Sequence, residues 1–109
     1  MRQAELRDRL GSAWSPRTAT AWREDNPALG QCSVTALVVQ EVLGGDILKT
    51  RVGGAWHFYN QVAGSRLDLT EGQFPGSIGY DDLPSTRDEA LADTSEAQLA
   101  ALREALFRP

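Results

Sequence analysis

Apolar residues near the start of the chain recur at helical spacing. Over residues 3 to about 14, Leu6, Leu10 and Ala13 fall on one face of a helix. This helix is expected to end at Ser15-Pro16, because the residue before a proline avoids the helical region. The pattern over residues 18–24 predicts a second, short helix, and turn-forming residues then lead to the middle of the chain.

The middle and the end of the chain each predict a further helix. Residues from 32 or 33 to 43 are apolar on nearly every side, which indicates a central helix buried on several faces. Gly44 and Gly45 end it, since glycine accepts the left-handed conformation that follows many helices. Ser95 with Gln98 three residues later is typical of a capped helix start, and apolar residues follow at helical spacing at Leu99, Leu102 and Leu106.

Three short segments between these helices have the pattern of strands. Residues 46–52 alternate in polarity, a Gly-Gly pair leads into residues 55–62, and a second turn leads into residues 66–70. Strands joined by such short turns pair antiparallel, so an antiparallel meander is expected. Residues 71–93, rich in glycine and proline, are expected to form an irregular loop. The predicted fold class is α+β.

Composition and net charge limit the number of domains, the partners and the cellular locations that are expected. A chain of 109 residues with 41% hydrophobic residues suits one domain with one core, spanning residues 1–109. The net charge is −4 and no basic block occurs, which argues against a nucleic-acid partner. The charged first residues do not resemble a signal peptide, and no apolar run is long enough to cross a bilayer, so no membrane association is expected. One cysteine allows no internal disulfide, and a free thiol favours the cytoplasm.

The single cysteine and the single histidine are the chief candidates for chemistry. Cys32 lies at or just before the first turn of the central helix, where free N–H groups and the helix dipole favour an anion such as a thiolate. A nearby imidazole would stabilise that anion further and give a nucleophile for acyl transfer. His57, in the second predicted strand, is the only imidazole available for this role. Packing inside the core is the competing interpretation of both residues.

Two residues compete to orient His57. If the turn after the second strand has two residues, alternation places His57 and Asp68 on the same sheet face as diagonal neighbours. A turn of three residues would place them on opposite faces. Asn60 is the rival partner, but it lies three residues from His57 on the same strand and therefore nominally on the other face. Asp68 is the favoured third member.

Two amide side chains near Cys32 in the sequence could support its chemistry. Gln31 and Asn26 are candidate amide donors for an oxyanion hole, and the backbone N–H of Cys32 could supply another donor. Loop or cap hydrogen bonding is the alternative for both amides. A zinc site is disfavoured, because catalytic zinc usually draws ligand pairs from short spacings and this chain has none. No metal and no cofactor are expected.

Several of these segments resemble a known family. The run NPALGQCSVTALVVQ over residues 26–40, with GGDIL at 44–48, HFYN at 57–60, DLT at 68–70 and QF at 73–74, resembles the YunG-like family of small bacterial proteins. The resemblance covers about residues 14–80. It names a group of proteins rather than an activity.

A looser similarity extends to papain-like and transglutaminase-like cysteine enzymes. There a helix begins with the nucleophilic cysteine, following strands supply a histidine, and a later strand supplies an aspartate. The similarity implies a small core of that kind, with Cys32 as nucleophile, His57 as general base and then acid, and Asp68 as orienting carboxylate. The chain departs from the papain pattern in lacking a tryptophan after the cysteine. It also has Asn26, not glutamine, six residues before Cys32.

These observations lead to two functional hypotheses. The first is a thiol-dependent hydrolase or acyl transferase that acts on an amide or thioester carbonyl, as a peptidase, deamidase or transglutaminase-like enzyme. Its substrate would be a small-molecule amide, a peptide or a protein. The second is a non-catalytic binding domain of the same fold, in which the cysteine and the histidine are structural.

Overall fold

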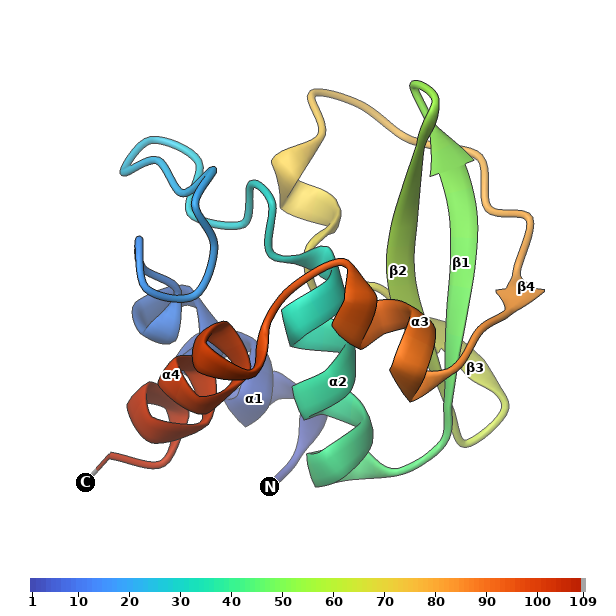
Figure 1. Cartoon of the computed structure of the whole chain (residues 1–109). Helices are drawn as coiled ribbons and strands as arrows, with labels where there is room; N and C mark the ends of the chain where they lie inside the picture. The colour runs from blue at the N-terminus through green and yellow to red at the C-terminus, as the bar shows by residue number, and fades with distance from the viewer. Residues whose placement is uncertain (109) are drawn as a thin grey trace.

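A four-stranded antiparallel sheet lies beside a group of helices in the computed structural model, which describes residues 1–108 (Figure 1). The strand order is β3-β2-β1-β4. Helix α2 packs against the sheet, and α1 and α4 lie on the side of α2 away from the sheet (Figure 1). The α+β class predicted from the sequence is therefore confirmed.

Helices α1 (Gln3–Ala13) and α2 (Cys32–Leu43) form where the apolar periodicity placed them. Seven consecutive residues of α2, 33–39, are buried, which agrees with a helix that is apolar on nearly every side. The indole Nε1 of Trp14, just after α1, donates to Oγ1 of Thr35 at 2.9 Å. This bond ties the end of α1 to the helix that begins at Cys32.

The sheet register depends on two tight turns. Strands β1 (Asp46–Val52) and β2 (Ala55–Val62) are joined at Gly53-Gly54, and β2 is joined to β3 (Ser65–Leu67) by Ala63 and Gly64 alone. Both residues of this second turn have positive φ, 51° and 80°, as a two-residue hairpin whose twist matches its strands requires. The turn pairs Asn60 with Leu67 and so fixes which β2 side chains share a face with the residues after β3.

The third strand is shorter than predicted. The pattern indicated a strand over residues 66–70, but β3 ends at Leu67. The reason is local: the Asp68 side chain accepts a hydrogen bond from the backbone N–H of Thr70, two residues on, and this turn competes with the strand ladder.

The short helix predicted over residues 18–24 does not form. These residues make successive turns, with the backbone N–H groups of Thr18 and Ala19 both donating to the Ser15 carbonyl. The Thr18 hydroxyl also accepts from the Ser15 N–H. Side-chain bonds of this kind satisfy the backbone locally and favour turns over a continuing helix.

The segment expected to be an irregular loop contains three small elements. They are a 3-10 turn η1 (Glu71–Gln73), an edge strand β4 (Leu83–Pro84) and a helix α3 (Arg87–Ala92). Strand β4 has only two residues and owes its existence to pairing with β1, which no local pattern encodes. Helix α3 is capped by Thr86, whose hydroxyl accepts from the Glu89 N–H, and it packs on α2.

The closing helix α4 (Glu96–Leu106) begins as predicted. Oγ of Ser95 accepts from the N–H of Gln98 at 3.1 Å. Leu99, Leu102 and Leu106 are buried against the core. No helix of residues 1–108 combines the length and the apolar character that crossing a membrane requires.

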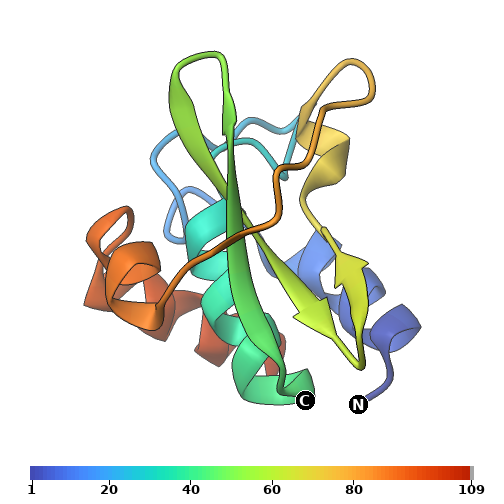
Figure 2. The same ribbon diagram turned by 90° about the vertical axis from the view of Figure 1, so that its right-hand side faces the viewer.

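Strand β2 is covered on both faces. Asn60 contacts α2 on one face, while the segment that follows β3 crosses the opposite face on its way to β4 (Figure 2). Tyr59 is bonded to Asp82 of this crossing segment, which we call the strap and define as residues 74–82. A central strand covered in this way can carry buried polar side chains whose partners come from either layer.

Candidate active site

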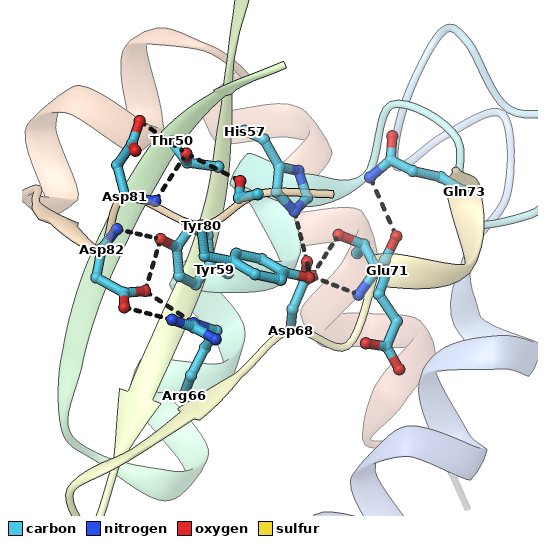
Figure 3. Close-up of polar contacts among 12 residues, drawn as sticks. Thr50, His57, Tyr59, Arg66, Asp68, Glu71, Gln73, Tyr80, Asp81 and Asp82 are labelled. Carbon is cyan, nitrogen blue, oxygen red and sulfur yellow. Dashed lines mark hydrogen bonds and ion pairs between the residues drawn. The ribbon is translucent and has the colours of Figure 1, made fainter. Parts of the chain in front are cut away.

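His57 and Asp68 form a hydrogen-bonded pair inside the protein. Nε2 of His57 lies 2.6 Å from Oδ2 of Asp68, and each side chain is only 3% exposed (Figure 3). The two-residue turn at Ala63 and Gly64 brings them to one sheet face, as alternation requires. Asp68 follows β3 directly, so it is a diagonal neighbour of His57 across the hairpin.

The Asp68 carboxylate accepts four hydrogen bonds. Oδ1 accepts from the backbone N–H of Thr70 at 3.1 Å and from its hydroxyl at 3.2 Å. Oδ2 accepts from the hydroxyl of Tyr80 at 2.8 Å, in addition to its bond with His57. Burial alone would raise the pKa of Asp68, but the bonds from His57, Tyr80 and Thr70 hold this pKa below its usual value. The carboxylate is therefore charged at neutral pH.

The His57 ring is enclosed by aromatic side chains. The edge of Phe74 meets the ring at a centroid distance of 4.9 Å, and Tyr59 is stacked with it at 5.8 Å. Burial disfavours the imidazolium, but Asp68 and the Cys32 side chain together outweigh that cost and raise the pKa of His57 to about 9. With Nε2 bonded to Asp68, Nδ1 is the ring nitrogen left for Cys32.

Cys32 is the first residue of α2 and is half-buried. Its position is set by the turn at Gly30, which has φ +75°, and by Gln31, which precedes the helix. The N–H groups of a first helical turn have no partners within the helix, and the positive end of the helix dipole lies there. The structure thus places the free thiol at a helix N-terminus and near enough to the imidazole ring to raise the pKa of His57.

Gln31 is completely buried next to Cys32. Its amide oxygen accepts from the Thr18 hydroxyl at 2.8 Å. Its amide nitrogen has no hydrogen-bond partner among residues 1–108, although buried polar groups are nearly always paired. This unpaired donor belongs to the residue that directly precedes Cys32 in the chain.

The side-chain amides of Asn60 and Asn26 each donate a hydrogen bond to a backbone carbonyl. The Asn60 amide donates to the Ala36 carbonyl of α2 at 3.0 Å, so Asp68, not Asn60, is the hydrogen-bonded partner of His57. The Asn26 amide donates to the Gln73 carbonyl at 3.1 Å. Gln73 also accepts from the Gly30 N–H, and it thereby joins the loop before Cys32 to the turn after Asp68. The Asn26 amide thus makes a loop hydrogen bond, which is the alternative to a role in an oxyanion hole.

The strap supplies residues that sequence reasoning missed. Asp82 has an unusual φ of +53°, accepts from the Tyr59 hydroxyl at 2.9 Å and is paired with the Arg66 guanidinium. That guanidinium also lies over the Tyr80 ring, 4.4 Å from its centroid. Tyr80 belongs to a segment without helical or strand periodicity, so no local signal pointed to its contact with Asp68.

A polar surface hollow lies close to the pair. It has a volume of about 360 Å³ and a lining that includes Arg23, Asn26, Gln73 and Phe74. Phe74 lines this hollow, and its ring also contacts the His57 ring. Within residues 1–108, His, Cys, Asp and Glu side chains form no group of three arranged to hold a metal ion.

Comparison with known proteins gives two matches. A family model described as YunG protein matches residues 2–108. A protein of Bacillus subtilis (strain 168), described as "Uncharacterized protein YunG", is 48% identical over 99 residues, which cover 91% of this chain and 86% of that protein. No solved structure matches the chain. The similarity thus extends beyond residues 14–80, where the sequence motifs lie.

Proposed function

This chain belongs to the YunG family, and we propose that it is a cysteine-dependent hydrolase or acyl transferase that uses Cys32, His57 and Asp68. One observation carries the proposal. The His57 ring is held by the buried Asp68 carboxylate through Nε2 and has the Cys32 side chain as its other polar neighbour. A nucleophile, a base and a group that orients the base are the parts that covalent catalysis by a thiol requires.

The charges of the three groups suit thiol chemistry. Because the pKa of His57 is about 9, the ring is an imidazolium at neutral pH. A cation beside a thiol at a helix N-terminus favours the thiolate, which is the reactive form. Asp68 remains ionised and stabilises the imidazolium beside Cys32.

The proposed reaction has two steps. In the first, Sγ of Cys32 attacks the carbonyl carbon of an amide or thioester, and His57 gives its proton to the departing nitrogen or sulfur. The product of this step is an acyl group bound to Cys32. In the second, water or an amine attacks the acyl carbon while His57 takes its proton, and the thiolate leaves with the imidazolium restored.

Two donors are suited to the oxyanion that forms in each step. The backbone N–H of Cys32 belongs to the first turn of α2 and has no partner within the helix. The unpaired amide nitrogen of Gln31 is the second donor. Groups that are fixed before reaction stabilise developing charge without reorganising, and such electrostatic terms are usually large.

The same proposal includes a small papain-like or transglutaminase-like core. Its support is the order of the elements, since a helix beginning at Cys32 packs on an antiparallel sheet that carries His57, and Asp68 follows the next strand. We expect a substrate with a polar amide or thioester, either a small molecule or a peptide. A reactive free thiol persists best in a reducing compartment, so a cytoplasmic location belongs to the proposal as well.

The first experiment is alkylation of Cys32 by iodoacetamide across a range of pH. Cys32 is the only cysteine, so every label reports on it. At about pH 6.5, roughly two units below the ordinary thiol value, the wild-type protein should react at least tenfold faster than the variants His57→Gln and His57→Ala. Unfolded wild-type protein gives the rate of the unassisted thiol.

Equal rates in the folded wild type and both variants would refute the enzymatic proposal. The His57–Asp68 pair would then be structural, and the chain would be a non-catalytic binding domain. A positive result justifies a screen of acyl and amide probes, with Cys32→Ser as the inactive control.

A further inference from the structure

We propose that Tyr80 is a positioning residue that holds the Asp68 carboxylate in line with the His57 ring. This inference rests on the proposed function, because it assigns Tyr80 to the same site. The Tyr80 hydroxyl donates at 2.8 Å to Oδ2 of Asp68, which is the oxygen that faces His57 Nε2 at 2.6 Å (Figure 3).

The other carboxylate oxygen shows why this bond matters. Oδ1 is held by the N–H and the hydroxyl of Thr70, both within two residues of Asp68. These local bonds fix one end of the carboxylate. Among residues 1–108, Oδ2 has two partners, His57 and Tyr80, so Tyr80 is the partner that does not take part in the proposed proton transfer.

Tyr80 itself is held by a contact on the face of its ring. The Arg66 guanidinium lies over its ring at 4.4 Å, and the same guanidinium is paired with Asp82, two residues further along the strap. Asp82 is in turn bonded through its backbone N–H to the Tyr59 hydroxyl at 2.8 Å. The strap therefore presents the phenol at a fixed point over Asp68.

The phenol remains a donor over the working pH range. Burial and the Asp68 carboxylate both raise the pKa of Tyr80 above its ordinary value of 10. The hydroxyl thus keeps its proton while His57 gains and loses one. A neutral donor that does not titrate can steer the pair without competing for the proton.

The test uses Tyr80→Phe, which removes the hydroxyl and keeps the ring that Arg66 covers. His57 is the only histidine, so its imidazole signals in proton NMR are unambiguous. Tyr80→Phe should lower the His57 titration midpoint and speed the exchange of the downfield Nε2–H proton, because Oδ2 is free to turn away. Alkylation of Cys32 near neutral pH should slow by about threefold to tenfold, the size expected for one hydrogen bond.

The matched control is Tyr59→Phe, which removes a hydroxyl that is bonded to Asp82 of the strap. It leaves every hydrogen bond to Asp68 in place. If Tyr80 positions Asp68 directly, this control, which loosens the strap but keeps the Tyr80 hydroxyl, changes the His57 midpoint and Nε2–H signal less than Tyr80→Phe does. Equal effects in both variants would mean that only strap packing matters, and an unchanged or raised midpoint in Tyr80→Phe would also overturn the inference. If wild-type alkylation proves independent of His57, the proposed reaction fails, while the NMR measurements still decide the role of Tyr80.

Discussion

Nε2 of His57 and Oδ2 of Asp68 meet at 2.6 Å across the β2–β3 hairpin, with both side chains withdrawn from solvent. Burying two charges is costly, and the cost is recovered only with good geometry and full hydrogen bonding. The four bonds to the Asp68 carboxylate meet that condition. The pair therefore links the stability of the fold to the chemistry of the candidate site.

The His57–Asp68 pair should make stability depend on pH in the alkaline range. The pKa of His57 is raised from 6.5 to about 9 on folding, so its contribution is fully present below about pH 6.5 and is lost as the pH rises through 9. The free energy of unfolding should fall by about 3 kcal/mol across this window. Urea denaturation at several pH values measures it, and His57→Gln should show a flatter profile.

The contribution of Asp68 to stability should depend on pH in the opposite sense. The pKa of Asp68 is lowered on folding, so its contribution is present above the ordinary value of 3.8 and is lost as the pH falls through the folded value. Asp68→Asn removes the charge, and the His57 midpoint should fall from about 9 to near or below 6.5 because burial then dominates. NMR titration of the single histidine measures the shift.

Asp46→Asn is the control for this substitution. Asp46 is exposed, and its carboxylate forms no hydrogen bond or ion pair within residues 1–108. The substitution Asp46→Asn removes the same formal charge as Asp68→Asn and leaves the His57–Asp68 pair unchanged. A His57 midpoint that is unaltered in Asp68→Asn would contradict the assignment of Asp68 as its partner.

Asn60→Ala should separate the two candidates for the third member. It removes the bond from Asn60 to the Ala36 carbonyl, which joins β2 to α2, and should lower the free energy of unfolding by about 1 kcal/mol. The His57 midpoint should stay near 9, because Asp68 is untouched. A midpoint that dropped as far as in Asp68→Asn would show that Asn60 orients the ring after all.

Two adjacent glycines offer a test of the connection between α2 and β1. Gly44 and Gly45 both have positive φ, 78° and 82°, so alanine is strained at either position. A Cβ at Gly44 meets open space, whereas one at Gly45 would collide with the Gln61 backbone carbonyl. Gly44→Ala should cost about 1 kcal/mol and Gly45→Ala at least about 2 kcal/mol more, measured by thermal unfolding. Equal losses would show that only backbone conformation matters there.

The sequence alone determined the features that depend on near neighbours along the chain. Apolar periodicity located α1, α2 and α4, and Ser95 with Gln98 marked the start of α4. The pairing of His57 with Asp68 belongs here only in part, since alternation places both on one face once the turn has two residues, and the structure supplied that turn length. These inferences work because hydrogen bonding and alternation act over a few residues.

Only the tertiary structure decided how distant segments meet. The two-residue strand β4 exists through pairing with β1, and Tyr80 reaches Asp68 because the strap crosses the sheet. The approach of Cys32 to His57 likewise depends on how α2 packs on β2. Such contacts follow from the burial of whole surfaces and not from local patterns, so no spacing in the sequence encodes them.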